Sequence, residues 1–322
     1  MRIRIGSRRS ALARAQTQHV IDLIKARNPD ADCRIHLIQS GGDKDRVSEF
    51  HQFGVIGVFT KAIEESLVQN EVDMVVHSLK DLPTTLADGM ALAAVPARAD
   101  PRDVLCGQTL MALPPGARVG TGSLRRRAQI LALRPDVKVE PIRGNVPPRL
   151  KLTKGANALD AVILAKAGLD RLDLGMEIAE ALDPDVFPYA VSQGALGVEV
   201  RARDKELIGL LKLIEDPRAR AECDAERAML HALGAGCSLP VGVKVAWEGD
   251  TLTVSAQVTA LDGSERILGT GRGPASDADA VGQACAAELR RKGGVKLLET
   301  SYRAYYHHFR LTQDGEARPP AE

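Results

Sequence analysis

Hydrophobic and polar positions alternate along the first two-thirds of the chain, so that short strand-like segments are followed by longer helical ones. Residues 2–6 have the pattern of a strand, and residues 10–27 have that of a helix whose apolar positions, such as Val20 and Ile24, fall near one face. The same order predicts strands at 33–38 and 73–77 with a helix at 59–69 between them. This alternation is typical of parallel or mixed sheets covered by helices.

A second unit with the same pattern follows the loop-like, hinge-like stretch 96–101. It has predicted strands and helices in alternating order: strand 118–120, a helix from 123, strand 137–141, a helix near 149 and strand 161–164. The glycine-containing stretch 192–195 has the composition of a second crossing between the units. Two crossings predict two periplasmic-binding-protein-like α/β lobes around a cleft, which is a common place for a ligand.

The last third has a different pattern. A helix at 216–233 is followed by alternating segments at 243–247, 251–259 and 266–271 and by a helix at 277–291, which predicts a small α+β domain. The expected domains are residues 1–97 with 193–215, then 98–192, then 216–300, and a C-terminal extension at 301–322. The extension carries Tyr302, Tyr305, Tyr306 and Phe309 at i, i+3, i+4, i+7, a stripe that would pack on the third domain or dock a partner.

Composition narrows the function. The 322 residues contain 43 Lys and Arg against 42 Asp and Glu, a balance that argues against binding of nucleic acid or membrane by bulk charge. Hydrophobic residues at 44% exclude wholesale disorder. No apolar run has the length of a membrane span. Five scattered cysteines without a CxxC pair predict a reduced, cytoplasmic protein with no metal site.

Positive charge is nevertheless concentrated between residues 118 and 149, where eight basic residues face only two acidic ones. Glycine-bearing turns at 120–126 and 143–146 lie within this stretch, and backbone N–H groups at a helix start with arginines beside them suit an anion. Several such arginines imply a ligand with several acidic groups: Arg125, Arg126, Arg143, Arg149 and, further on, Arg171. Solvated helix faces are the alternative, which we favour for Arg127 and Arg134. A nucleotide phosphate is disfavoured because neither a Walker A nor a GxGxxG sequence is present.

Candidate chemistry follows the apolar strand ending near residue 77. Polar side chains at a strand end are where an open α/β sheet places its active site, so Lys80 could bind an anion and Asp81 could hold a developing cation or move a proton. The alternatives are that Asp81 caps a turn and that His77 is a satisfied core histidine. Cys237 lies in the glycine loop 234–240, where a thiolate could form a covalent bond, although most lone cysteines are buried hydrophobes. We assign the other four to packing: Cys33, Cys106, Cys223 and Cys285.

Together these segments resemble the porphobilinogen deaminase (hydroxymethylbilane synthase) family, from about residue 3 to about residue 298. The motifs that carry the resemblance are GSRRS at 6–10, VHSLKDLP at 76–83, DPRD at 100–103, GTGSLRR at 120–126, RGNV at 143–146, AKAGLDRL at 165–172, AERA at 225–228 and GCSLP at 236–240.

The resemblance implies an enzyme that adds four porphobilinogen molecules head to tail, with loss of ammonia, and then releases hydroxymethylbilane by hydrolysis, in haem biosynthesis. It implies a dipyrromethane cofactor held on Cys237 by a thioether, with Asp81 as the catalytic carboxylate. The positions that match cofactor binding are Lys80, Ser123, Arg125, Arg126 and Gly144, and those that match substrate binding are Arg8, Ser10, Arg143, Arg149, Arg171 and Gln193. A monomer is implied, and transient contact with the next pathway enzyme stays open.

Some residues depart from the family pattern: Ile56 and Gln52 where lysines are frequent, Pro147-Pro148 before Arg149, and Ser192 in place of a glycine. They raise one alternative, a family member that assembles its cofactor but turns over poorly. A second alternative, from another class, is a non-enzymatic two-lobe cytoplasmic protein that binds a polycarboxylate. This second alternative assigns no role to Asp81 or Cys237.

Overall fold

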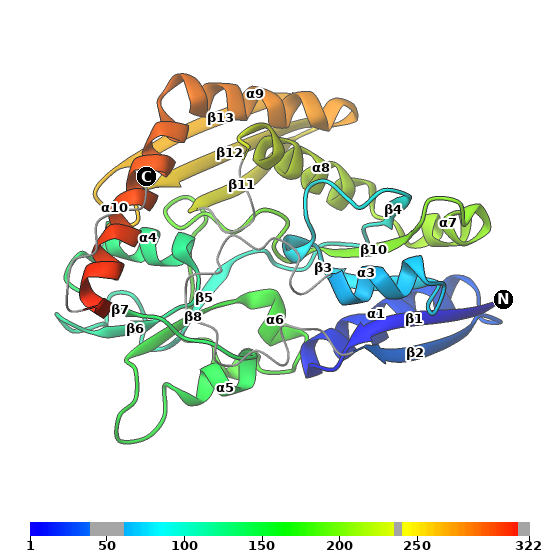
Figure 1. Cartoon of the computed structure of the whole chain (residues 1–322), viewed down its shortest axis with the longest axis horizontal. Coiled ribbons are helices and arrows are strands. Elements are labelled where there is room, and N and C mark those ends of the chain that lie inside the picture. Colours follow the sequence, from blue (N-terminus) through cyan, green and yellow to red (C-terminus); the bar gives the residue numbers. More distant parts are fainter. Residues whose placement is uncertain (39–60, 235–239, 315–322) are drawn as a thin grey trace.

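The computed structural model describes residues 1–38, 61–234 and 240–314, which form two α/β lobes and a smaller third domain (Figure 1). In the first lobe, five strands have the order β2-β1-β3-β10-β4. Their bounds are β1 (Arg2–Arg8), β2 (Asp32–Ile38), β3 (Met74–Ser78), β4 (Met90–Ala94) and β10 (Leu196–Arg201). β1 is parallel to β2 and β3, whereas β10 runs antiparallel to its neighbours β3 and β4.

Helices cover both faces of this sheet because its central strands β3 and β10 are buried on both sides. They are α1 (Ala11–Arg27), α3 (Lys61–Val68) and α7 (Lys205–Leu211), with 3₁₀ turns η2 (Leu79–Asp81) and η4 (Lys212–Ile214). Val20 and Ile24 of α1 pack with Ile3, Met74 and Val198 in one core, as the helical spacing predicted. The packing of α3 against the sheet forms a second core, which includes Ile63, Leu67, Val72 and Val75.

The second lobe repeats this plan with the strand order β7-β6-β8-β5-β9. Its elements are β5 (Asp103–Gly107), β6 (Arg118–Gly120), α4 (Leu124–Leu133), β7 (Lys138–Glu140), α5 (Val146–Lys151), β8 (Ala161–Ala165), α6 (Lys166–Asp170), η3 (Gly175–Glu177) and β9 (Glu180–Ala181). Leu105 and Ile163 contribute to the core on one face, and Val104 and Val162 to the core on the other. Successive residues of a strand point to opposite faces, so a sheet covered on both sides needs continuous apolar runs.

The third domain is an antiparallel sheet covered by helices. Its elements are α8 (Pro217–Ala232), β11 (Val241–Glu248), β12 (Thr251–Thr259), β13 (Arg266–Pro274), η5 (Ala275–Asp277), α9 (Ala278–Arg291) and α10 (Gly294–Asp314). Gly282 lets α9 lie directly on α8, since a Cβ there would overlap the carbonyl oxygen of Ala225. The expected fold class is confirmed: two five-stranded mixed α/β sheets and a small α+β domain.

Strand β10 was not predicted from the sequence, and it decides how the first lobe is built. It follows the second lobe in the chain, begins at Leu196 and pairs with both β3 and β4, so the chain returns to its first sheet after residues 192–195. Its buried positions include Glu199 and Arg201, which disguise the strand's apolar pattern. Both are compensated: Glu199 pairs with His77 at 2.9 Å, and Arg201 donates to the carbonyl oxygens of Leu67 and Val72.

None of the helices in residues 1–38, 61–234 and 240–314 is long and apolar enough to cross a membrane. Within the same ranges, no group of three or more His, Cys, Asp or Glu side chains is placed to hold a metal ion.

Candidate active site between the two lobes

A cavity of about 100 Å³ lies where the two lobes meet. Residues from α1 and the end of β3 line it on the first lobe, and residues from α4, α5, β8 and α6 line it on the second. Its polar and charged lining residues are Gln16, Ser78, Lys80, Arg126, Arg149 and Arg171. A cavity at the carboxyl ends of β3 and β8 is the place where α/β sheets bind ligands.

The end of β3 delivers the first two predicted residues. A single 3₁₀ turn, η2, follows Ser78 and carries Lys80 and Asp81. The Nζ of Lys80 donates to Oε1 of Gln193 at 3.1 Å, so a residue of the inter-lobe crossing holds it. Asp81 is exposed on the same turn. His77 is buried with Nε2 2.9 Å from Oε2 of Glu199, which makes it a satisfied core histidine.

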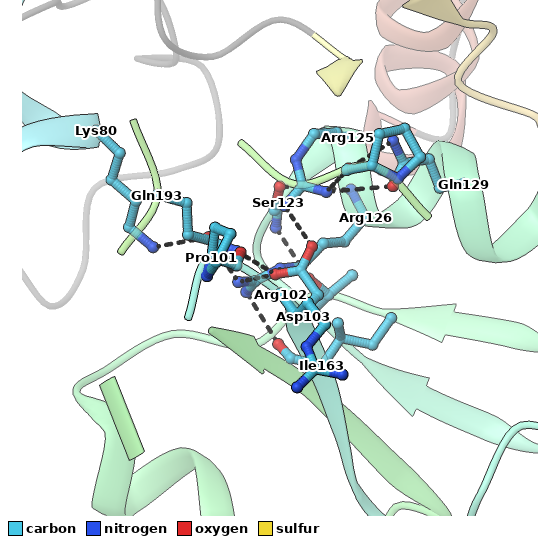
Figure 2. A network of polar contacts seen from close by, with 12 residues as sticks. Lys80, Pro101, Arg102, Asp103, Ser123, Arg125, Arg126, Gln129, Ile163 and Gln193 are labelled. Carbon is cyan, nitrogen blue, oxygen red and sulfur yellow. Dashed lines mark hydrogen bonds and ion pairs between the residues drawn. The ribbon is translucent and has the colours of Figure 1, made fainter. Parts of the chain in front are cut away.

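The start of α4 delivers the next group. Ser123 caps the helix, since its Oγ accepts from the backbone N–H of Arg126 at 3.4 Å. Arg125 and Arg126 follow in the first turn and both pair with the carboxylate of Asp103, at 2.7 Å each (Figure 2). Arg126 also donates to the carbonyl oxygen of Ile163, at 3.0 Å, and lines the cavity.

Asp103 is the residue that the sequence analysis missed as a functional position. It begins β5, is fully buried and also accepts from Nε2 of Gln193 at 2.9 Å. Burial alone would raise the pKa of its carboxyl, but Arg125 and Arg126 outweigh burial and lower that pKa to about 2. Asp103 is therefore ionised and neutralises part of the arginine charge. The sequence signal was the motif at 100–103, in which only a tertiary contact distinguishes Asp103 from a loop acid.

Arg125 is used differently from the expectation that it binds cofactor. Its Nη1 donates to the carbonyl oxygen of Pro188 at 2.7 Å and to Oε1 of Gln129 at 3.2 Å, while Nη2 meets Asp103. The side chain does not line the cavity and is only 4% exposed. Successive residues of a helix point about 100° apart, so Arg126 faces the cavity and Arg125 faces the backbone at Pro188. In this conformation Arg125 has a structural role.

Three cations of the cavity are less well compensated. Burial and the nearby charge of Arg126 lower the pKa of Lys80 to about 8, although Asp81 opposes the shift. Burial also lowers the pKa of Arg149 to about 10 and that of Arg171 to about 10. Among the described atoms, Nε of Arg149 is buried without a hydrogen-bond partner. Removing a cation from water is costly unless a counter-ion compensates it, so such side chains favour the binding of an anionic ligand.

Asp81 lies within electrostatic reach of this group. Its negative charge raises the pKa of both Lys80 and Arg149, against the stronger effect of burial. The two cations come from different lobes, so the carboxylate stands at the meeting of the lobes. An exposed acid therefore lies beside several half-buried bases.

The other predicted positions do not line the cavity. Arg8 ends β1, and Ser10 caps α1 by accepting from the N–H of Ala13 at 3.2 Å. Arg143 and Gly144 are exposed on the loop before α5, where Gly144 has φ +100°, a value that favours glycine. Cys237 lies outside the described residues.

Two polar side chains of the cavity lining were not predicted as site residues: Gln16 and Ser78. Nε2 of Gln16 donates to Oγ of Ser78 at 2.7 Å, which ties α1 to the end of β3. Ser78 lies within the motif at 76–83, whereas Gln16 has no distinguishing signal apart from being a polar position on the apolar side of a helix.

Two departures from the family pattern now have a structural context. Pro147 and Pro148 occupy the first turn of α5, where a helix loses nothing by lacking N–H groups. Ser192 has φ +58°, in the region that favours glycine, and its N–H donates to Oε2 of Glu226 at 2.5 Å. The departures at Ile56 and Gln52 lie outside the described residues.

The third domain is tied to both crossings between the lobes. Arg98, on the first crossing, donates to both carboxylate oxygens of Glu226 on α8, at 2.7 and 3.1 Å. It also donates to the carbonyl oxygen of Gln193 on the second crossing, at 2.9 Å. Arg227, next on α8, donates to the carbonyl oxygens of Leu82 and Pro83, just after Asp81. Helix α8 thereby supports the turn that carries the candidate catalytic acid.

The fold and the site define a class: a two-lobed α/β protein with a cationic cavity between the lobes and the exposed carboxylate of Asp81 at its edge. Comparison with known proteins identifies the family. The model for the porphobilinogen deaminase dipyromethane cofactor binding domain matches residues 3–209, and that for the porphobilinogen deaminase C-terminal domain matches residues 220–291. The chain belongs to the porphobilinogen deaminase family.

Curated relatives agree over nearly the full length. The porphobilinogen deaminase of Roseiflexus castenholzii is 47% identical over 298 residues, which cover 91% of this chain and 97% of the relative. The enzyme of Acidothermus cellulolyticus is 46% identical and covers 92% and 91%, and that of Brevibacillus brevis is 42% identical and covers 92% and 96%. A solved structure of reduced OxyR from N. meningitidis covers 66% of this chain and 93% of its own, at 13% identity and a TM-score of 0.37. The curated relatives carry the assignment.

Proposed function

We propose that this chain is a working porphobilinogen deaminase, a transferase that joins four porphobilinogen molecules head to tail and releases hydroxymethylbilane. The observation that supports this most directly is the set of half-buried cations, Lys80, Arg149 and Arg171, around a cavity with the exposed carboxylate of Asp81 beside it. Each pyrrole of the substrate carries acetate and propionate groups, which such cations would hold. A binding protein for a polycarboxylate would need the cations but would have no use for the acid.

The proposed division of labour assigns the acid to the reacting centre. Loss of ammonia from the aminomethyl group of porphobilinogen leaves a cation on the pyrrole, and a nearby carboxylate stabilises it and accepts or returns protons. Asp81 is exposed on its turn and is the acid whose charge reaches Lys80 and Arg149. The bases, by contrast, fix the carboxylates of the substrate and orient the ring.

The residues of the cavity fit the dipyrromethane cofactor that the matched family model describes. Arg126, Arg149 and Lys80 would hold its acidic side chains, and the unpartnered, buried Nε of Arg149 is a donor suited to one of them. We propose Cys237 as the covalent anchor through a thioether. When bound, the cofactor supplies the pyrrole position to which the first substrate is joined. The residues proposed for the substrate and the growing chain are Arg8, Ser10, Arg143, Arg149, Arg171 and Gln193.

The remaining expectations belong to the same proposal. We propose that the lobes are residues 1–97 with 193–215 and residues 98–192, that residues 216–300 carry the cofactor, and that the protein acts as a monomer in the cytoplasm. Strands β1–β4 with β10, and strands β5–β9, form the two separate sheets, which supports the first part of this division.

Intact-mass measurement tests the proposed function. The purified chain should weigh more than its sequence by one dipyrromethane, and alkylation should not label Cys237, while porphobilinogen should be consumed. A bare mass with a freely alkylated Cys237 would contradict the proposal. An adduct without consumption would instead favour the family member with poor turnover.

A pH dependence follows from Lys80. In the ligand-free chain its pKa is about 8, and an anion beside it stabilises the protonated form, so binding above pH 8 must take up a proton. In a Cys237→Ser variant, which cannot form the thioether, porphobilinogen affinity measured by calorimetry should fall by up to about tenfold per pH unit above pH 8. The same variant with Lys80→Arg should lose this dependence, because arginine stays charged. An equal decline in both would contradict the role of Lys80.

A further inference from the structure

Helix α4 carries a third arginine, Arg127, whose surroundings differ from those expected of a solvated helix face. Its guanidinium lies over the ring of Tyr305 of α10, with Cζ 5.3 Å from the ring centroid. Its Nη1 donates to the carbonyl oxygen of Val139 at 3.3 Å. An arginine stacked on an aromatic ring and bonded to a strand fixes the orientation of the helix on which it sits.

An apolar contact surrounds this stacked pair. Leu124 and Ala128 of α4 pack with Leu261 of the third domain, and Tyr302 and Tyr305 of α10 pack against this cluster. The N–H of Leu261 donates to Oγ of Ser301 at 2.6 Å, which fixes the start of the aromatic segment. Figure 1 shows α10 leaving the third domain and running past α4 toward β6 and β7 of the second lobe. Tyr302 and Tyr305 therefore pack on the second lobe as well as on the third domain.

The contact with α10 can affect the cavity because α4 is one helix that packs against other parts of the protein on three of its faces. Leu124, Arg127 and Ala128 face α10, and Arg125 with Gln129 faces the backbone at Pro188. Arg126 faces Asp103 and the cavity. Tyr305 of α10 contacts Arg127, and Arg126 is the preceding residue on the same helix. A rotation of α4 about its axis would therefore move the side chain of Arg126 as well.

We propose that α10 is an internal brace in which Tyr302 and Tyr305 act as positioning residues that hold α4, and with it Arg126, in register with Asp103 and the cavity. The inference deepens the proposed function and rests on it for its effect on turnover. The expected effect of the brace on the stability of α4 is independent of the proposed function. Neither Tyr302 nor Tyr305 is among the residues that line the cavity.

The first test measures α4 itself. In the full-length protein, the double variant Tyr302→Ala, Tyr305→Ala should exchange the amide hydrogens of residues 124–133 at least about tenfold faster than the parent, because the helix loses the cover of one face. Arg303→Ala is the matched control: the residue is on the same turn of α10, but it is exposed. Its exchange in α4 should be unchanged. Equal exchange in the double variant and the control would overturn the brace.

The second test measures positioning. Tyr305→Phe keeps the ring under Arg127 and should retain parental kinetics, whereas Tyr305→Leu keeps an apolar side chain without the ring and should lower kcat/KM for porphobilinogen about tenfold. Parental kinetics in Tyr305→Leu would overturn the positioning role. If the double variant does not fold, these two single variants carry both measurements. Absence of turnover in the parent contradicts the proposed function alone, since the exchange measurement needs no turnover.

Discussion

Asp81→Asn is expected to lower kcat for porphobilinogen about 10²- to 10⁴-fold, the range that a positioned acid–base group contributes. The amide has the shape of the carboxylate but neither stabilises a cation nor accepts a proton at neutral pH. Asp81 is exposed on η2, and a surface substitution of this kind changes the free energy of unfolding by about 0.5 kcal/mol at most. The loss should therefore be a loss of chemistry and not of fold.

The measurement is initial-rate kinetics expressed per cofactor-loaded chain, with the loaded fraction taken from intact mass. Asp88→Asn is the matched control, because Asp88 is exposed in the same connection between η2 and β4 and undergoes the same chemical change. It should keep the parental kcat. Turnover near the parental value in Asp81→Asn would remove Asp81 from the reaction.

Asp103→Asn is expected to destabilise the protein by about 3–5 kcal/mol, the cost of breaking a buried ion pair by removing one partner. Arg125 and Arg126 would keep their charges in a site where they are 4% and 6% exposed, with no other carboxylate within the ion-pair distance among the described residues. The midpoint of urea unfolding should fall by roughly 1 M or more, since the slope of such curves is about 1–3 kcal/mol per molar.

Glu140→Gln is the control for a surface pair. Glu140 meets Arg118 at 2.5 Å, but their side chains are 38% and 43% exposed, and pairs of this kind contribute about 0–1 kcal/mol. A second variant separates charge from shape. Asp103→Leu combined with Arg125→Met and Arg126→Met should recover much of the lost stability, because no charge is then left buried. An unchanged midpoint in Asp103→Asn would show that the two arginines are compensated in another way.

The local pattern of the sequence predicted the elements near the site well because their signals are local. The helix at 10–27 is observed as Ala11–Arg27 with Ser10 as its cap, and the helix predicted from 123 is observed as Leu124–Leu133 with Ser123 as its cap. Caps and apolar periodicity depend on residues three or four positions apart, so they can be read without the fold. The position of Lys80 and Asp81 directly after a buried strand is of the same kind.

The missed features depend on contacts between residues far apart in the chain. Asp103 resembles any loop acid until β5 brings it to Arg125 and Arg126, about 23 residues later. Arg127 and Arg134 were wrongly interpreted as solvated: one stacks on Tyr305, and the other donates to the carbonyl oxygens of Leu110 and Leu113. An arginine counts as a polar position in the sequence pattern whether its guanidinium is solvated or bonded to another part of the protein, so the pattern cannot distinguish the two cases.

The sequence by itself determined the class of fold, the family resemblance and which residue types stand at the strand ends, because strand, helix and cap signals are short-range and motifs are contiguous. Only the tertiary structure decided which of the clustered arginines face the cavity. Asp103 forms ion pairs with Arg125 and Arg126 and neutralises part of their charge. Lys80, Arg149 and Arg171 remain as the cations that an anionic ligand would neutralise. The physical reason is that burial and pairing set the effective charge of a side chain, and both are properties of distances that the linear order does not contain.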